Sequence, residues 1–394
     1  MNADADAALQ ALFLPFETGQ LAWPSEGGAL FLRARDGWPL HRQSRPGLVC
    51  AQGFKPAAEA LQHSGLTLVD EDAAHGCASA AGGCALPSVA GCAEAAPSDD
   101  ARYALVLLLP PRQREESRAL FARAIARLRP GGIVLACIAN DEGAKTGEAD
   151  LTLLVGPLSV LSKHLCRVFW SQPLDAAVNP ALQSAWSTLD APRELLDGNV
   201  RGGRFISRPG VFAWDRVDAA SALLAAHIPD DLAGHGADLG AGWGYLGCEV
   251  LARAPRVTAL DAYEADARSL ALARTNLAAI AAPATLGFHW HDVTAGLPMH
   301  YDFLVSNPPF HALGRHERPD IGRAFIAAAA NALKPGGRFW LVANRHLPYE
   351  IVLDEKFGQV RSVAQQGGFK VIEAVKSTPG QATTRKPTSG RKRR

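Results

Sequence analysis

Short apolar runs alternate with amphipathic segments along most of the chain. One example is the apolar run YALVLLL, which is followed by the helical pattern REESRALFARAIARL and then by the apolar run GGIVLACIA. Apolar runs of this length, separated by helical patterns, are typical of buried parallel strands joined by crossover helices. The pattern therefore predicts an α/β architecture with a largely parallel sheet.

Two stretches lack this alternation. Residues 74–98 consist mostly of Ala, Gly, Ser and Cys without an apolar period, which predicts a loop. Residues 377–394 contain no large apolar side chain and end in four consecutive basic residues, which predicts a disordered basic tail.

The pattern of strands and helices occurs twice, with the same turn residues between them. Residues 103–140 and 301–344 each begin with a Tyr-led apolar strand that ends in Pro-Pro, and a helix follows in each. In both, Pro-Gly-Gly then leads into a second strand that ends in Ala-Asn. Pro-Gly-Gly is a common turn between helix and strand, so convergence is an alternative. Agreement of all these features in one order favours duplication.

The two copies differ at the first strand's end. The second copy has Asn307-Pro308-Pro309-Phe310 where the first has Leu109-Pro110-Pro111-Arg112, and the first has no glycine-rich turn directly after a strand. We therefore predict two tandem domains: a degenerate N-terminal domain over 1–195 and a working domain over 196–376. A linker within 190–208 joins them, and the tail follows.

A glycine-rich turn begins the working copy. ADLGAGWGYLG leads from a short strand into the helix CEVLARA, with Gly240, Gly242 and Gly244 in the turn. Glycines at such a turn let the backbone approach a ligand that lies over the helix N-terminus. The next strand ends at Asp261, 17 residues past Gly244, close to the spacing at which a carboxylate meets ribose hydroxyls.

Two classes of cofactor fit this turn. Gly242, Gly244 and Gly247 satisfy the dinucleotide fingerprint, so an NAD-dependent enzyme is one alternative. Asp238 argues against it, because a carboxylate just ahead of the turn repels a pyrophosphate but suits the cationic amino group and sulfonium of S-adenosylmethionine. Asp292, after the next apolar stretch, is placed to accept from an adenine amino group, although Asp is also common in turns. A packing turn without a ligand is the remaining alternative.

The Asn-Pro-Pro-Phe segment indicates the chemistry. Pro308 and Pro309 lack backbone donors, so carbonyls around them are free to accept, while Asn307 adds a side-chain acceptor and Phe310 a flat apolar face. An amino group on a planar base or amide is a poor nucleophile because its lone pair is delocalised. Hydrogen bonds from its protons to Asn307 Oδ1 and the Pro308 carbonyl would turn the lone pair towards a methyl donor, with Phe310 stacked on the ring. No metal is required, and a plain turn is the alternative.

Composition and charge indicate the class of protein, its compartment and the kind of partner. The 394 residues are 48% apolar and 20% charged, which is typical of a soluble globular protein of two or three domains. The seven cysteines are scattered and never spaced C-x-x-C, which fits a reducing cytoplasm rather than a disulfide framework or zinc site. No run is long enough to span a membrane. Residues 334–394 hold 13 Lys and Arg against 4 Asp and Glu, which predicts contact with nucleic acid or another acidic surface.

The segments DLGAGWG, LDAYEADA, SNPPFH, LKPGG, VANRHLPYE and GFKVIEA together resemble the ribosomal RNA guanine-N2 methyltransferases of the small subunit methyltransferase C and large subunit methyltransferase G type. The resemblance implies a class I, Rossmann-like methyltransferase fold in each half, with S-adenosyl-L-methionine bound only by the second. It further implies methyl transfer to the exocyclic N2 amino group of a guanine in ribosomal RNA, with 16S favoured over 23S, on the RNA or a ribosomal subunit.

Carried over by position, the resemblance assigns Asp238 and the three turn glycines to the methionine end of the cofactor, Asp261 to the ribose and residues 307–310 to the target base. The N-terminal copy would aid folding and RNA engagement, and the tail would be an auxiliary RNA anchor. Trp243 and Tyr245 depart from the small residues expected around the turn.

Two other functions are compatible with the same residues. One is an amino-methyltransferase that acts on adenine N6 or on a protein glutamine, because Asn-Pro-Pro-aromatic segments serve those reactions too. The other is a non-catalytic RNA-binding assembly factor, against which the intact glycine turn and Asn307 argue.

Overall fold

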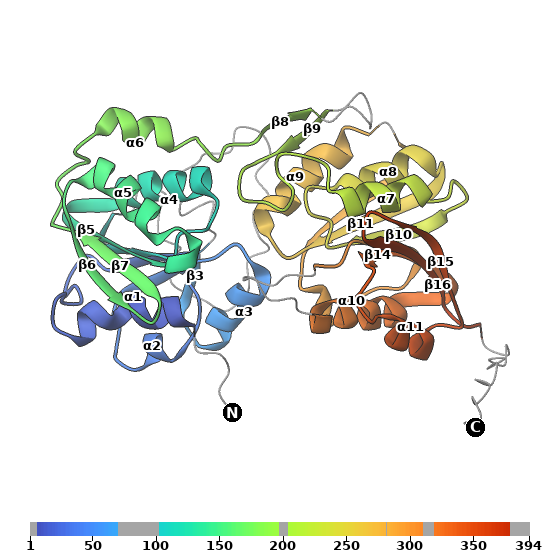
Figure 1. Cartoon of the computed structure of the whole chain (residues 1–394), viewed down its shortest axis with the longest axis horizontal. Coiled ribbons are helices and arrows are strands. Elements are labelled where there is room, and N and C mark those ends of the chain that lie inside the picture. Colours follow the sequence, from blue (N-terminus) through green and yellow to red (C-terminus); the bar gives the residue numbers. More distant parts are fainter. Residues whose placement is uncertain (1–5, 70–101, 197–203, 281, 310–318, 379–394) are drawn as a thin grey trace, which may run out of the picture. The chain divides into compact units, whose positions relative to one another are not determined.

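The computed structural model describes residues 6–69, 102–196, 204–280, 282–309 and 319–378 (Figure 1). The loop predicted at 74–98 and all but the first two residues of the predicted tail lie outside this description. The chain forms two compact units. The first comprises Met1–Glu194, Ser207–Asp215 and Asp266–Arg268, and the second comprises Leu195–Ile206, Arg216–Ala265 and Ser269–Arg394.

The first unit contains a seven-stranded sheet of order β3-β2-β1-β4-β5-β7-β6. Strands β1 to β5 pair in parallel with one another, and β7 runs antiparallel to β5 and β6. Its strands are β1 (Ala29–Leu32), β2 (Leu48–Ala51), β3 (Thr67–Val69), β4 (Tyr103–Leu108), β5 (Leu128–Ala139), β6 (Leu158–Lys163) and β7 (Cys166–Ser171). Its helices are α1 (Ala7–Glu17), α2 (Trp38–His41), α3 (Lys55–His63), α4 (Arg114–Ala126), η2 (Asn140–Glu142), α5 (Ala144–Val155) and α6 (Pro180–Trp186).

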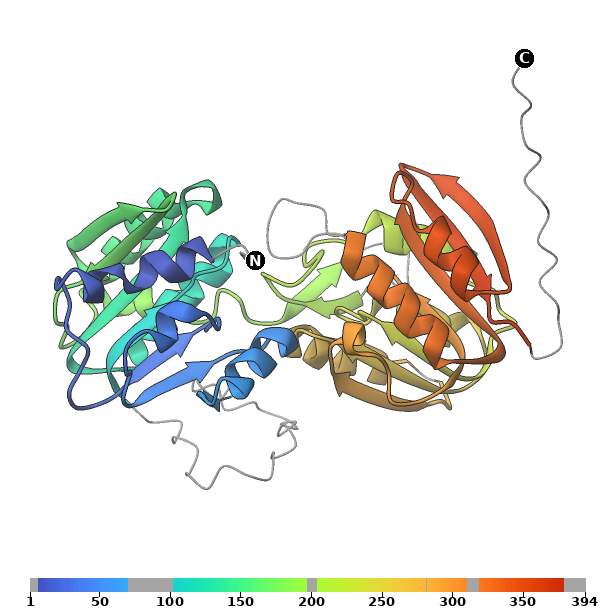
Figure 2. The same cartoon turned by 90° about the horizontal axis from the view of Figure 1, so that it is seen from below.

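The second unit repeats this plan, with a seven-stranded sheet of order β12-β11-β10-β13-β14-β16-β15. Its strands are β10 (Ala233–Leu239), β11 (Arg256–Glu264), β12 (Thr285–Trp290), β13 (Tyr301–Ser306), β14 (Leu333–Asn344), β15 (Gln359–Gln366) and β16 (Phe369–Val375). Its helices are α7 (Ala219–His227), α8 (Tyr245–Arg253), α9 (Ala267–Ala278, of which the first two residues belong to the first unit), η4 (Val293–Ala295), α10 (Pro319–Ala332) and α11 (Glu350–Lys356). Helix α10, orange in Figure 2, packs on one face of this sheet.

The two sheets have the same strand order when each is numbered from its own first strand. This confirms the two tandem α/β domains, which were predicted from the repeated order of strands, helices and turn residues. The antiparallel hairpin at the end of each sheet, β6 with β7 and β15 with β16, is an addition to the largely parallel sheet that the pattern predicted.

Both faces of the first sheet are covered at its central strands, which explains the continuous apolar run of β4. Along β4, Val106 and Leu108 pack in one cluster with Phe121 of α4, while Leu105 and Leu107 pack in the other with α1. Successive side chains of a strand point to opposite faces, so a strand covered on both sides must be apolar at every position.

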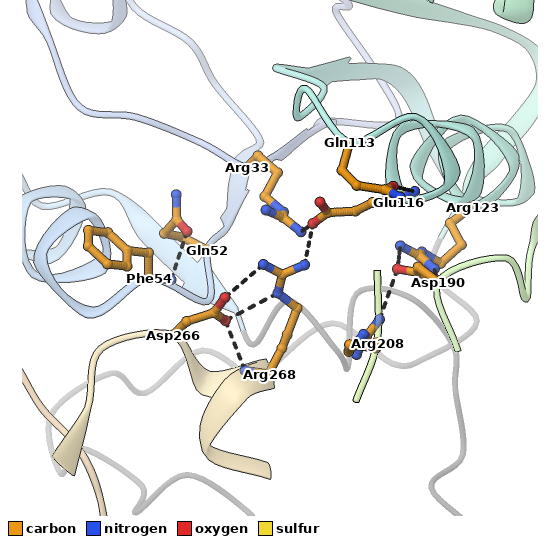
Figure 3. Close-up of polar contacts among 10 residues, drawn as sticks. All are labelled: Arg33, Gln52, Phe54, Gln113, Glu116, Arg123, Asp190, Arg208, Asp266 and Arg268. Atoms are coloured by element: carbon orange, nitrogen blue, oxygen red, sulfur yellow. Dashed lines mark hydrogen bonds and ion pairs between the residues drawn. The ribbon is translucent and has the colours of Figure 1, made fainter. Parts of the chain in front are cut away.

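The predicted linker has structure at both of its ends. Strands β8 (Arg193–Leu196) and β9 (Arg204–Ser207) pair as a two-stranded ribbon. Asp190, just ahead of it, is buried and accepts from Arg123 at 2.6 and 2.8 Å and from Arg208 at 2.8 Å (Figure 3). The three side chains hold the start of this segment within the first unit.

The first unit has ion pairs where the second has its glycine turn. Arg33 follows β1 as Gly240 follows β10, and both have a positive φ, 56° and 73°. Such a φ costs a non-glycine residue about 1–3 kcal/mol. The Arg33 side chain donates to Glu116, which is buried and also accepts from Arg268 (Figure 3). At the edge where the second unit has its glycine turn, the first unit thus has a positive-φ arginine and its ion pair with Glu116.

Candidate functional site

Strand β10 delivers the glycine turn to the carboxyl edge of the second sheet. Gly240, Gly242 and Gly244 have φ values of 73°, 55° and 91°, which only glycine adopts without strain. The amide nitrogens of Gly240 and Ala241 donate to the Tyr263 carbonyl at 2.9 and 3.0 Å, which anchors the turn on β11. A Cβ added at Gly242 would meet no atom within 4 Å, so the turn is open at this residue.

The two bulky residues of the turn lie in the interior. Trp243 and Tyr245 are buried and pack against Phe205, with ring centroids 5.0 and 5.8 Å from its ring. Asn276 Nδ2 donates to the Trp243 carbonyl at 2.7 Å and holds the backbone of the turn. The departure of Trp243 and Tyr245 from small residues is therefore accommodated by packing.

Asp238 lies beneath the turn. It is fully enclosed, and its Oδ2 accepts from the amide nitrogen of Gly247 in the first turn of α8 at 2.9 Å. Its Oδ1 has no hydrogen-bond partner among the described residues. The pKa of Asp238 is raised to about 7, chiefly because burial disfavours the charged form; the Gly247 hydrogen bond opposes this rise and the charge of nearby Glu264 adds to it.

The two carboxylates of β11 have different surroundings. Asp261 lies inside the sheet, where its Oδ2 accepts from Tyr301 Oη at 2.8 Å and lies 3.0 Å from His235 Nε2. Burial alone would raise the pKa of Asp261, but hydrogen bonds from His289 and Tyr301 outweigh burial and lower it. Glu264 is the last residue of the strand, and its Oε2 accepts from the Gly242 amide nitrogen at 2.8 Å. The glycine turn thus meets Glu264, three residues beyond the carboxylate that the sequence pattern singled out.

Asp292 follows β12, the neighbour of β11 in the sheet. Its Oδ1 accepts from the amide nitrogen and hydroxyl of Thr294 at 2.8 and 2.7 Å, so it begins η4 as a capping residue. The carboxylate is half-buried.

Strand β13 places Asn307 beside the glycine turn. Strands β10 and β13 are parallel neighbours, with Leu239 opposite Ser306, and Ser306 Oγ donates to the Leu239 carbonyl at 2.7 Å. Gly240 and Asn307 are the next residues along each strand, and neighbouring strands lie about 4.8 Å apart. Leu239 and Ser306 lie 67 residues apart in the sequence, and their pairing brings the glycine turn and the Asn-Pro-Pro turn together.

The amide of Asn307 is held at one end only. Its Nδ2 donates to Asp218 Oδ2 at 3.0 Å and to Ser221 Oγ at 2.8 Å, whereas its Oδ1 has no hydrogen-bond partner among the described residues. Pro308 is buried and Pro309 is exposed. Phe310 lies outside the described residues.

Sequence reasoning missed Glu264, Asp218, Ser221 and Asn276. A cap signal was present for Asp218, since an Asp three residues ahead of a Ser at the start of an apolar helix is typical of an N-cap. The described part of the chain has no group of three or more His, Cys, Asp and Glu side chains that could hold a metal ion. Nor does it contain a helix long and apolar enough to cross a membrane.

Comparison with known proteins identifies the family of this chain. The family model of the methyltransferase small domain matches residues 202–373. The ribosomal RNA small subunit methyltransferase C of Pseudomonas paraeruginosa is 32% identical over 278 residues, which cover 69% of this chain and 79% of that protein. The chain belongs to the ribosomal RNA small subunit methyltransferase C family. The small subunit methyltransferase C of Psychromonas ingrahamii is 28% identical over 280 residues, 71% of this chain and 78% of that protein.

A solved structure of the family matches both units. It is the T. thermophilus 16S rRNA N2 G1207 methyltransferase (RsmC) in complex with AdoMet and guanosine, and it matches with a TM-score of 0.74 and 26% identity. The match covers 95% of this chain and 93% of that one. Both α/β units are thus part of the small subunit methyltransferase C fold, while the methyltransferase small domain model matches the second half.

Proposed function

We propose that this chain transfers a methyl group from S-adenosyl-L-methionine to the exocyclic N2 amino group of a guanine in the ribosomal RNA of the small subunit. The observation that carries the proposal is the pairing of β10 with β13, which sets a glycine turn beside an Asn-Pro-Pro turn. Family membership and the structural match to a 16S rRNA N2 methyltransferase with AdoMet and guanosine support the cofactor and the base.

The second unit's residues fit this cofactor. Gly240, Gly242 and Gly244 leave the open backbone that a ligand over the α8 N-terminus needs, and Glu264 stands at the strand end where a carboxylate meets ribose hydroxyls. Glu264 therefore takes the role that the sequence pattern gave to Asp261, and Asp292 takes the adenine amino group. Asp238 is enclosed, so it acts on the turn through Gly247 and on the methionine amino group only through its unpartnered Oδ1.

S-adenosyl-L-methionine supplies a methyl carbon made electrophilic by its sulfonium. The chain's own residues then have to orient the guanine amino group. Asn307 Oδ1 and the Pro308 carbonyl would accept hydrogen bonds from its two N–H groups, which turns the nitrogen lone pair towards the methyl carbon, and Phe310 would stack on the base. The nitrogen–carbon bond forms as the bond from the methyl carbon to sulfur breaks, S-adenosylhomocysteine leaves, and the methylated nitrogen gives one of its protons to solvent. Positioning is the main catalytic contribution in this scheme.

The RNA partner is 16S ribosomal RNA or the subunit that contains it, in the cytoplasm. The basic excess of residues 334–394 supports an auxiliary electrostatic contact with the RNA, which added salt would weaken through loss of counterion release. The first unit, degenerate at its cofactor edge, contributes folding and RNA engagement.

The experiment is transfer of labelled methyl from S-adenosyl-L-methionine to unmodified small subunits, large subunits, naked 16S RNA and naked 23S RNA. We expect label in the small-subunit samples alone. Label in large-subunit RNA would move the substrate to the other subunit, and label in none of the four, with cofactor binding confirmed, would favour an amino-methyltransferase on another target.

A further inference from the structure

The orientation of the Asn307 amide decides what this side chain can do. The oxygen of an asparagine amide only accepts hydrogen bonds and its nitrogen only donates them. In the proposed reaction Asn307 must accept from the guanine amino group, so its oxygen must face the base. If the amide were flipped, its NH2 group would face the guanine amino group, and two hydrogen-bond donors would oppose each other.

Two side chains of the α7 N-terminus hold one end of this amide. Asp218 is the N-cap of α7 and Ser221 lies in its first turn. Asn307 Nδ2 has two protons, and they are used by Asp218 Oδ2 at 3.0 Å and Ser221 Oγ at 2.8 Å. Oδ1 is left buried without a hydrogen-bond partner among the described residues.

Asp218 is selective for one orientation. An ionised carboxylate accepts hydrogen bonds and donates none, so a flipped Asn307 would place two oxygens against each other and lose the contact. The same Oδ2 also accepts from the amide nitrogen of Ser221 at 2.9 Å, which fixes the carboxylate on the helix. The backbone of α7 thus sets the direction of the Asn307 amide.

We infer that Asp218 and Ser221 are positioning residues, which hold the Asn307 oxygen towards the guanine amino group. This inference rests on the proposed function. It assigns a task in the methyl transfer to the start of α7, through two side chains that act by way of Asn307.

The test compares variants under saturating cofactor. In Asp218→Ala combined with Ser221→Ala, Asn307 keeps its side chain but loses both partners, and we expect kcat to fall about 10- to 100-fold, the scale of a misplaced reactive group. Asp218→Asn restores an oxygen that can cap Ser221 and accept from Asn307, so we expect kcat within about 3-fold of the wild type. Because Asp218→Asn keeps the acceptor oxygen but removes the negative charge, recovery of kcat in this variant would show that the hydrogen bond, and not the charge, supports activity.

Two controls separate positioning from general loss of structure. Asn179→Ala removes the N-cap of α6, where Asn179 accepts from the Leu182 amide nitrogen at 3.0 Å in the first unit, and should leave kcat unchanged. The Kd for S-adenosylhomocysteine, measured by calorimetry, should stay within about 2-fold in all variants.

A wild-type kcat in the double variant, or a Kd that changes as much as kcat, would overturn the inference while the proposed function stood. An inactive wild-type enzyme with all ribosomal substrates would instead count against the proposed function itself. Failure of Asp218→Asn to recover activity would also contradict the inference, provided that its Kd for S-adenosylhomocysteine matches the wild type.

Discussion

At the scale of single residues, neighbouring polar groups decide which side chains are available to a ligand. Asp261 and Glu264 lie three positions apart on β11, yet Asp261 is engaged by Tyr301 and His235 inside the sheet. Glu264 ends the strand and contacts the Gly242 amide. The availability of a carboxylate therefore follows from where the strand ends, and Glu264, 20 residues past Gly244, also fits the expected spacing better than Asp261 at 17.

These two carboxylates give a direct test of the ribose assignment. Glu264→Gln weakens a charge-assisted contact, and we expect the Kd for S-adenosyl-L-methionine to rise about 10-fold or more. Asp261→Asn, the matched control, should change this Kd by less than about 2-fold while it lowers the melting temperature, because it disturbs a buried network. Calorimetric titration and thermal melts measure both. A large rise of this Kd in Asp261→Asn with little change in Glu264→Gln would instead assign the ribose contact to Asp261.

Asp238 has a pH-dependent effect on stability whose sign follows from its burial. Its pKa is about 7 in the folded protein and near 3.9 in an unfolded chain, so the folded state keeps the proton over this interval. The unfolded state loses its proton first, and the contribution of Asp238 to the free energy of unfolding therefore falls as pH rises from about 4 to 7.

Asp238→Asn cannot ionise and should escape this fall. The free energy of unfolding of the variant, minus that of the wild type, should rise by about 3 kcal/mol between pH 4.5 and 7.5. Urea titrations at several pH values measure the difference. A difference that does not change with pH would show that Asp238 ionises normally in the fold.

At the scale of elements, helix α4 carries two adjacent glutamates with unequal roles. Glu116 is buried and accepts from Arg33 and Arg268, whereas Glu115 forms an exposed pair with Arg193 at 3.0 Å. Removal of one partner from a buried cluster leaves charges that have lost their water, while exposed pairs contribute little.

The two glutamates form a matched pair of variants. Glu116→Ala should lower the free energy of unfolding by about 3–5 kcal/mol, and Glu115→Ala by less than about 1 kcal/mol. Chemical denaturation of the full chain measures both values. Equal, small losses would mean that the cluster around Glu116 contributes no more than a surface pair.

Most elements could be predicted from the sequence because strands covered on both faces are apolar at every position. YALVLL of β4 stands out for this reason, as does the buried run FLV within YDFLVS of β13, and the prolines that follow mark the turns. The end of β11 could not be placed in this way. Its apolar run stops at Leu260, but pairing with β12 continues to Glu264, and polar partners make Asp261 tolerable inside the sheet.

Contacts between distant segments were also beyond the sequence pattern. The approach of Asp218 to Asn307 depends on α7 lying near the end of β13, which spacing along the chain does not encode. The ion pair of Arg33 likewise depends on Glu116 of helix α4, eighty-three residues away in sequence.

At the scale of the whole molecule, two copies of one fold have diverged at the same edge of their sheets. The second unit has Gly240 and Asn307 after its two central strands, and the first has Arg33 and Leu109 at those positions. Leu109 is buried in the core and Arg33 pairs with Glu116, so polar and apolar contacts occupy this edge in the first unit. We therefore predict that the second unit performs the methyl transfer.

The most direct test of this claim compares the wild type with Asn307→Ala on unmodified small subunits, with labelled S-adenosyl-L-methionine and digestion of the RNA to nucleosides. We predict that wild-type label elutes as N2-methylguanosine and that Asn307→Ala transfers about 100-fold less, with its Kd for the cofactor unchanged. Label in another nucleoside, or undiminished transfer by Asn307→Ala, would contradict the account.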